Sequence, residues 1–157
     1  MIVPPILIFG YGNPSRGDDA LAPRFLDQME PLTQEPPLAG QVELLTDYQL
    51  QIEHALDLRQ RQRVLFVDAS LDGPEPFDFQ PLKPDATLTY TTHAMSPAAV
   101  LAVYEKIQPE PLPPCFLLAI RGYVFDLGEP LSAGAQSNLS QALTFARQWL
   151  EKDHNAL

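Results

Sequence analysis

Apolar residues gather in short runs along the chain, and these runs have the length of strands. Pro5–Phe9, Val64–Val67 and Cys115–Ile120 are apolar without interruption, a pattern typical of parallel strands buried on both faces. Gln41–Thr46 and Ala86–Tyr90 are further strand predictions, the second because polar and apolar positions alternate there.

Segments with helical periodicity lie between these runs. The apolar residues from Leu21 to Met29 recur at helical spacing, and Pro23 requires this helix to begin near Asp19, since proline is tolerated only in the first turn. Further helices are predicted over Leu50–Leu58, after Ser96 as N-cap with Pro97 at the first position, and from Ser132 onward. Strands that alternate with helices predict an α/β fold with a mostly parallel sheet, covered by helices on both faces.

Proline is unusually frequent, with 17 residues in 157, and it gathers between the predicted elements. The clusters lie at Pro31–Pro37, Pro74–Pro84 and Pro109–Pro114, and we interpret them as connectors. They are too short for domain linkers and the chain has no internal repeat, so we expect residues 1–157 to form a single domain.

Charge and cysteine content exclude several classes of protein. The 20 acidic and 10 basic residues give a formal charge of −10, which disfavours nucleic acid and anionic membranes as partners. Cys115 cannot form an internal disulfide, Met1–Pro5 does not resemble a secretory signal, and no apolar run reaches the ~18–20 residues that cross a bilayer. We expect a cytoplasmic protein, and a monomer because no heptad seam is present.

Candidate chemistry follows from the rule that ligands of parallel α/β sheets bind outside the carboxyl ends of the strands. The first predicted strand is followed by a glycine-rich turn that ends in Asp18 and Asp19, the third by Asp68 and the fourth by His93. In a parallel sheet, Asp19, Asp68 and His93 would converge on one crevice. Two carboxylates and one imidazole suit a first-row transition ion such as nickel or zinc, with coordination positions left open.

Simpler interpretations of these residues stay open. Either Asp18 or Asp19 can cap the helix that follows, and Asp68 can form a turn. His93 can be an ordinary polar residue, whereas only the joint placement of the three groups favours a site. The remaining histidines are not expected as ligands: His54 lies in a helical pattern and His154 lies in a terminal tail.

Two other kinds of site are disfavoured. A dinucleotide-binding loop would use Gly10 and Gly12, with Asp47 as the acidic residue that ends the second strand. However, Ser15 stands where the third glycine of that loop belongs, and the carboxylates that end the loop would repel a pyrophosphate. Cys115 begins a buried strand and is interpreted as a core residue rather than a nucleophile.

Several short motifs together resemble one family. Gly10–Asn13 precedes Asp18–Asp19, a strand ends in Asp68–Ala69, and Thr92–His93 stands ahead of Ser96–Pro97. In this order and spacing they resemble the hydrogenase maturation proteases, endopeptidases that trim the C-terminal extension from the large subunit of [NiFe] hydrogenases. Asp47–Leu50 and Arg121–Tyr123 further resemble the branch that serves the soluble, NAD(P)-linked bidirectional hydrogenase.

The resemblance implies a three-layer α/β/α fold of the phosphorylase/hydrolase-like kind, with a mostly parallel, twisted sheet of about five strands. It implies that Asp19, Asp68 and His93 are the catalytic residues and the ligands of a nickel ion that the substrate carries. The implied substrate-binding residues are Gly10, Gly12, Asn13, Asp18 and Asp47.

The chain departs from the family pattern at two positions. Asp19 stands where the family often has glutamate, which moves the carboxylate back by about one methylene. Asp47–Leu50 replaces a D-G-G-T segment found in many members, so the role of Asp47 is open.

The implied function is removal of the C-terminal extension of the hydrogenase large-subunit precursor after nickel insertion. No tightly bound cofactor is expected, although zinc or cadmium is a possible surrogate for the nickel of the precursor. A precursor without nickel lacks the charge that neutralises two carboxylates, so it binds poorly. Either nickel or a carboxylate activates the attacking water.

Two alternatives use the same residues. The first is a self-contained hydrolase that holds its own divalent ion, and the second is a non-catalytic nickel-binding accessory module for metallocentre assembly.

Overall fold

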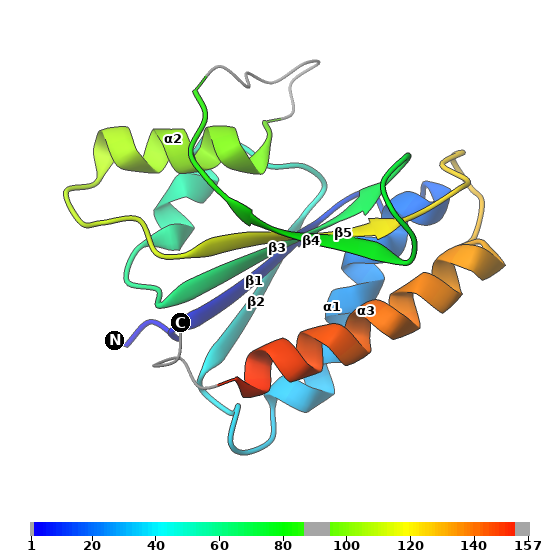
Figure 1. Ribbon diagram of the computed structural model, residues 1–157, viewed down its shortest axis with the longest axis horizontal. Coiled ribbons are helices and arrows are strands. Elements are labelled where there is room, and N and C mark those ends of the chain that lie inside the picture. The colour runs from blue at the N-terminus through cyan, green and yellow to red at the C-terminus, as the bar shows by residue number, and fades with distance from the viewer. Residues whose placement is uncertain (1, 87–94, 153–157) are drawn as a thin grey trace.

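The computed structural model describes residues 2–86 and 95–152, which form a five-stranded sheet with helices on both faces (Figure 1). The strands lie in the order β2-β1-β3-β5-β4, and β4 runs antiparallel to β5 while the other pairs are parallel. Their bounds are β1 Ile6–Tyr11, β2 Val42–Asp47, β3 Arg63–Ser70, β4 Phe77–Leu82 and β5 Cys115–Arg121. The predicted α/β fold with a mostly parallel sheet is confirmed.

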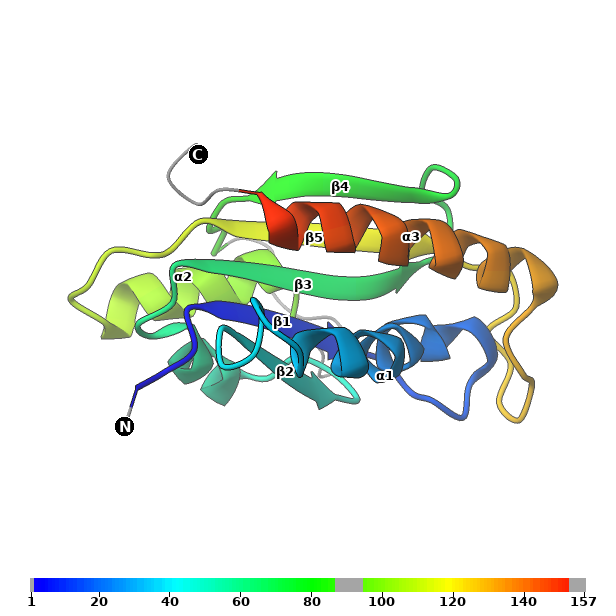
Figure 2. The same ribbon diagram turned by 90° about the horizontal axis from the view of Figure 1, so that it is seen from below.

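The helices form the outer layers (Figures 1 and 2). Helices α1 (Leu21–Thr33) and α3 (Ala133–Glu151) cover one face of the sheet, and α2 (Pro97–Ile107) covers the other together with the 3₁₀ helix η2 (Ile52–Leu58). A short 3₁₀ turn, η1 (Gly17–Ala20), leads into α1. None of the helices in the described part of the chain is long and apolar enough to cross a membrane.

Side-chain caps fix where two of these helices begin. The Ser96 hydroxyl accepts a hydrogen bond from the Ala99 N–H at 3.1 Å, and the Ser132 hydroxyl accepts one from the Ala135 N–H at 3.2 Å. Each bond satisfies an N–H group that the first helical turn leaves without a partner. Pro97 needs no such partner, because it has no N–H.

The central strands divide the core into two layers. Along β1, Ile6 and Ile8 face α1 and α3, whereas Leu7 and Phe9 face α2 and η2, and all four are buried. Burying an aliphatic or aromatic side chain of this size contributes about 1.5–3 kcal/mol. The uninterrupted apolar run in the sequence therefore reflects burial on both faces of the sheet.

The fifth strand differs from the prediction. Most of the predicted strand Ala86–Tyr90 lies outside the described residues, and the strand at this edge of the sheet is β4, inside the segment Pro74–Pro84. The interpretation of that whole segment as a connector was wrong. Pro81 is tolerated within β4 because an edge strand leaves one row of N–H groups unpaired.

Aromatic packing holds β4 in place. The Phe79 ring lies 5.3 Å from Phe116 of β5 and 4.8 Å from Phe145 of α3, measured between ring centroids. Phe77, two residues earlier on the same face, lies 5.1 Å from Phe145. Aromatic contacts of this kind contribute about 0.5–1.5 kcal/mol beyond the area that they bury.

A buried arginine ties β3 to the end of α3. The Arg63 guanidinium donates to the backbone carbonyls of Trp149 at 2.9 Å and Leu150 at 3.3 Å, and it lies over the Trp149 ring at 4.2 Å. These carbonyls belong to the last helical turn, which has no partners of its own and carries the negative end of the helix dipole. Arg63 therefore acts as the C-terminal cap of α3.

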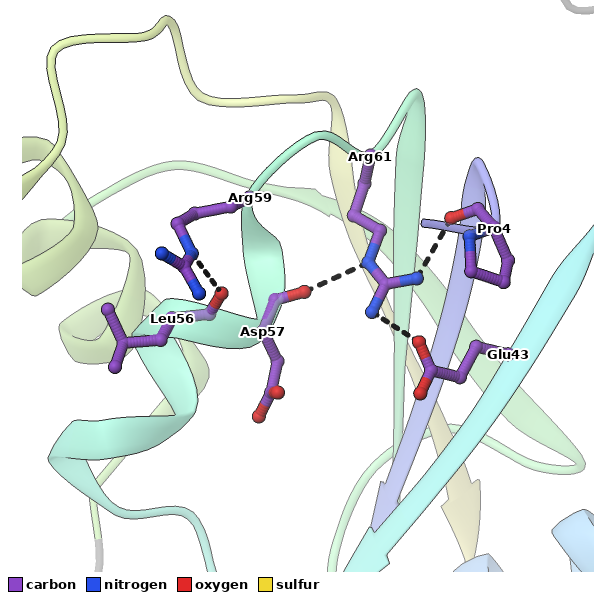
Figure 3. A network of polar contacts seen from close by, with 6 residues as sticks. All are labelled: Pro4, Glu43, Leu56, Asp57, Arg59 and Arg61. Carbon is purple, nitrogen blue, oxygen red and sulfur yellow. Dashed lines mark hydrogen bonds and ion pairs between the residues drawn. The ribbon is translucent and has the colours of Figure 1, made fainter. Parts of the chain in front are cut away.

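A second arginine closes the amino-terminal edge of the sheet (Figure 3). Arg61 donates to the Asp57 carbonyl at 2.9 Å, to the Pro4 carbonyl at 2.8 Å and to the Glu43 carboxylate at 2.6 Å. Its side chain is only 4% exposed. Because these partners lie at the end of η2, before β1 and in β2, Arg61 fixes η2 relative to the sheet.

Candidate active site

The carboxyl ends of β1, β2 and β3 bring together residues that are far apart in the sequence. Tyr11 ends β1 and stands in register with Asp47, the last residue of β2. On the other side of β1, Gly10 pairs with Val67, which places Tyr11 beside Asp68 of β3. Since neighbouring strands lie about 4.8 Å apart, Asp47, Tyr11 and Asp68 form a row across this edge of the sheet.

The turn after β1 holds the carboxylate of Asp19. Gly12 has a φ of +155°, and a Cβ atom there would lie 2.3 Å from the Asp19 carbonyl oxygen, so only glycine fits. The Asn13 N–H donates to Asp19 Oδ2 at 2.7 Å, and Asn13 Oδ1 accepts from the Ser15 N–H at 2.8 Å. Gly12 and Asn13 therefore shape the turn that positions Asp19.

Asp68 is held in an unusual electrostatic environment. Burial is the main cause that raises its pKa to about 7, and the charge of Asp19 raises it as well. Hydrogen bonds from the Ala69 N–H, at 2.7 Å, and from the Tyr11 hydroxyl act in the opposite direction. Burial, followed by the charge and hydrogen bond of Asp68, raises the pKa of Tyr11 well above its usual value, so Tyr11 stays a hydrogen-bond donor.

This pair of carboxylates can perform two kinds of chemistry. A carboxyl group with a pKa of about 7 can accept and return a proton near neutral pH, as a general base and acid must. Alternatively, Asp19 and Asp68 can receive a cation, which would neutralise two charges that otherwise disfavour each other. Both possibilities require Asp19 and Asp68 to lie close together. The charge of Asp19 raises the pKa of Asp68, which indicates that they do.

Asp18 faces away from this site. Its side chain is fully buried, and its carboxylate accepts hydrogen bonds from the N–H groups of Tyr123 (2.7 Å), Val124 (3.0 Å) and Ser132 (2.8 Å) and from the Ser132 hydroxyl (2.7 Å). Burial alone would raise its pKa, but these hydrogen bonds outweigh it and lower the pKa. Asp18 neither caps its own helix nor lies open to a substrate, because it ties η1 to the loop after β5.

Gly10 also has an internal role. A Cβ atom on Gly10 would lie 3.0 Å from Leu26 Cδ1 and 3.2 Å from the Ala22 carbonyl oxygen, so the missing side chain lets α1 approach β1 closely. Gly10 is buried, which argues against the direct contact with a substrate that the family resemblance implied.

Asp47 is engaged by residues that the sequence did not connect with it. Its Oδ1 accepts from the Tyr48 N–H at 2.6 Å, and its Oδ2 lies 3.2 Å from His54 Nε2 of η2. Its backbone carbonyl accepts from the Gly12 N–H at 3.1 Å. An open cavity of about 380 Å³ lies beside this contact, lined by Gly12, Pro14, Pro23, Thr46, Asp47 and Tyr48.

The third expected ligand, His93, lies outside the described residues. Within residues 2–86 and 95–152, no three histidine, cysteine or acidic side chains are grouped so as to hold a metal ion. Met95, two residues beyond His93, donates its N–H to the Leu50 carbonyl at 3.3 Å. Met95, where the described part of the chain resumes, therefore lies beside the loop between β2 and η2.

Cys115 has the role that the sequence predicted. It is buried at the start of β5, and burial raises the pKa of its thiol to about 12. A thiol in this state is not a nucleophile at neutral pH.

Tyr11 and His54 are the site residues that sequence reasoning missed. Tyr11 stands between the two glycines of the turn and ends the first strand, so the rule that selected Asp68 could also have selected it. His54 gave no such signal, because its position in a helical pattern does not reveal which residue its ring faces.

No protein-family model and no curated protein matches this sequence. Solved structures do match its fold. The hydrogenase maturating endopeptidase HybD from E. coli is 21% identical with a TM-score of 0.70, covering 92% of this chain and 91% of that chain. The [NiFe] hydrogenase maturation protease HycI from Thermococcus kodakarensis KOD1 is 20% identical with a TM-score of 0.68, covering 95% and 94%. At these identities the similarity establishes the fold, and the chemistry must be argued from the site.

Proposed function

We propose that this protein is an endopeptidase of the hydrogenase maturation family, which removes the C-terminal extension of a [NiFe] hydrogenase large-subunit precursor after nickel has been inserted. The observation that carries the proposal is the proximity of Asp19 and Asp68 at the carboxyl edge of the sheet, where the motifs of that family predict its working residues. The fold shared with solved structures that carry this description supports it.

In this proposal, Asp19, Asp68 and His93 receive the nickel ion that the precursor carries. Asp68 is half-buried and lies beside another carboxylate, and both features disfavour its charged form until a cation arrives. A nickel-loaded precursor supplies that cation and a nickel-free precursor does not. The precursor therefore binds well only after the metal has been inserted, because only then does it neutralise the carboxylates.

We assign proton transfer to Asp68. Hydrolysis of a peptide bond requires a group that takes a proton from the attacking water and passes it to the leaving amide nitrogen. This pKa of about 7 belongs to the site without a cation, where Asp68 exists in both protonation states near neutral pH. With the ion in place, the oxygen of Asp68 that does not bind it takes the proton. Asp19, whose Oδ2 is fixed by the Asn13 N–H, serves as an anchored carboxylate beside it.

The client that we propose is the large subunit of a soluble, NAD(P)-linked hydrogenase. The segments Asp47–Leu50 and Arg121–Tyr123 support this assignment through their resemblance to that branch of the family. Processing of this precursor, compared with the precursor of a membrane-bound hydrogenase, tests the assignment. Equal rates for both would contradict it.

Substitutions at the site test the proposed function. His93→Ala and Asp19→Asn should each lower the rate of precursor processing by at least about 100-fold, because each removes a group that touches the reacting centre. Asp27→Asn, an exposed carboxylate of α1, is the matched control and should process normally. A folded His93→Ala protein with full activity would contradict the proposal.

Metal content separates the proposal from a self-contained metallohydrolase. We propose that the protein works as a cytoplasmic monomer without a tightly bound metal of its own. Elemental analysis of the purified protein should therefore find less than one equivalent of metal for each chain. One tightly held ion per chain would favour a resident metal instead.

A further inference from the structure

The loop between β2 and η2 is held by an unusual set of polar contacts centred on His54. The Gln51 N–H donates to His54 Nδ1 at 2.8 Å, so Nδ1 acts as an acceptor and carries no proton. Nε2 is then the protonated nitrogen of the neutral ring, and it donates to Asp47 Oδ2 at 3.2 Å. The ring edge packs against Phe9 at 4.7 Å between centroids, and the side chain is only 12% exposed.

Asp47, which His54 holds in place, makes further hydrogen bonds that fix the neighbouring residues. Its other carboxylate oxygen accepts from the Tyr48 N–H at 2.6 Å, which sets the direction of the chain as it leaves β2. Its carbonyl accepts from the Gly12 N–H, so the same residue also holds the turn that positions Asp19. With both carboxylate oxygens occupied by groups of its own chain, Asp47 is suited to shape the site rather than to react.

These contacts leave the side chain of Tyr48 pointing into solvent beside the site. It is 64% exposed, and it lines the cavity of about 380 Å³ together with Gly12 and the prolines Pro14 and Pro23. The cavity lies at the carboxyl edge of the sheet, next to the residue that ends β2. An exposed aromatic ring and two proline rings form a suitable contact for an extended polypeptide.

We propose that His54 is a positioning residue, which acts through Asp47 to fix Tyr48 as a contact for the substrate polypeptide beside the carboxylate pair. This inference deepens the proposed function and rests on it, because it assumes that a polypeptide enters this edge of the sheet. The occupant of the cavity is the precursor segment next to the bond that is cut.

Two isosteric substitutions separate this role from simple capping of η2. In His54→Asn, the side-chain oxygen takes the place of Nδ1, which keeps an acceptor for the Gln51 N–H and removes the bond to Asp47. In His54→Gln, the side-chain amide takes the place of Nε2, which keeps the donor to Asp47 and removes the acceptor for Gln51. The positioning role predicts that the KM for precursor processing rises about 10-fold in His54→Asn, with kcat within about twofold, and stays close to wild type in His54→Gln.

A purely structural role predicts the reverse. If His54 only caps η2, His54→Gln is the impaired variant, with a lower midpoint of unfolding, and His54→Asn behaves like the wild type. Tyr48→Ala should raise KM as His54→Asn does. The two changes together should raise KM no further, because both remove the same contact between Tyr48 and the substrate. A normal KM in His54→Asn, or equal impairment of both His54 variants, would overturn the inference.

The wild-type protein in the same assay reports separately on the proposed function. Processing by the wild type with an unchanged KM in His54→Asn overturns only the role of His54. Where the wild type binds the precursor without cutting it, the dissociation constants of the two variants replace KM in the comparison. A wild type that neither cuts nor binds the precursor overturns both.

Discussion

Replacing Asp68 by asparagine should stabilise the protein while removing its activity. The amide keeps the size of the carboxyl group, and its oxygen can still accept from the Ala69 N–H that now lies 2.7 Å from Asp68 Oδ1. The Tyr11 hydroxyl can bond to the amide as well. What the substitution removes is a negative charge that the fold buries, and that charge is needed for the proposed chemistry.

The size of the effect follows from the pKa of Asp68. A rise from the ordinary value of 3.8 to about 7 corresponds to ~4 kcal/mol at 1.36 kcal/mol per pH unit. Because part of the carboxyl group is accessible to solvent, we expect about 2–4 kcal/mol. Below pH 4 both the folded and the unfolded state carry the proton, so the cost is absent there. It grows as the pH rises from about 4 to 7 and is complete above 7.

Urea unfolding of wild type and Asp68→Asn between pH 4 and 8, with a chelator present, measures this cost. The free energies of unfolding should agree near pH 4 and diverge up to pH 7, with the variant the more stable protein. Asp27→Asn should follow the wild type at every pH, since its side chain is exposed. A variant that is equally or less stable than wild type at pH 8 would refute the reasoning, because burial of the charge would then carry no cost.

Three further predictions concern buried groups outside the reaction itself. Asp18→Asn should lower the free energy of unfolding, measured in urea at pH 7, by about 3 kcal/mol. The NH₂ group of the asparagine would replace one of the two carboxylate oxygens and would then face backbone N–H donors. Since the pKa of Asp18 is lowered by folding, this difference should shrink as the pH falls below about 4. Arg63→Met should lose about 2–4 kcal/mol in the same measurement, because the last carbonyls of α3 lose their donors. Cys115 should react with iodoacetamide at pH 8 at least about 100-fold more slowly in the native protein than in urea, because burial raises its pKa to about 12. A native thiol that reacts rapidly, or either variant with wild-type stability, would contradict the corresponding contact.

The elements that the sequence predicted well are those with local signals. The apolar run that begins β1 and the serine before α2 act within a few residues, and the structure places a strand and a helix there. β4 was missed because its signal is not local. Phe77 and Phe79 do alternate, but their partners Phe116 and Phe145 come later in the chain, and the surrounding prolines suggested a connector.

The candidate site was predictable to the extent that strand ends determine it. Asp19 and Asp68 follow two parallel strands, so the rule for α/β sheets brings them to one edge. The sequence did not indicate which carboxylate of the pair Asp18–Asp19 faces the site, because the groups that engage Asp18 come more than 100 residues later. The contact between His54 and Asp47 depends on the shape of the intervening loop, which no periodicity encodes.

The measurement that tests the central claim most directly is the mass of the hydrogenase large-subunit precursor after incubation with the purified protein, with and without nickel inserted. We predict loss of a C-terminal peptide from the nickel-loaded precursor alone. Cleavage that does not depend on nickel would contradict the assignment of Asp19, Asp68 and His93 as the groups that detect the metal. A precursor that keeps its full mass in both forms would contradict the proposed endopeptidase function.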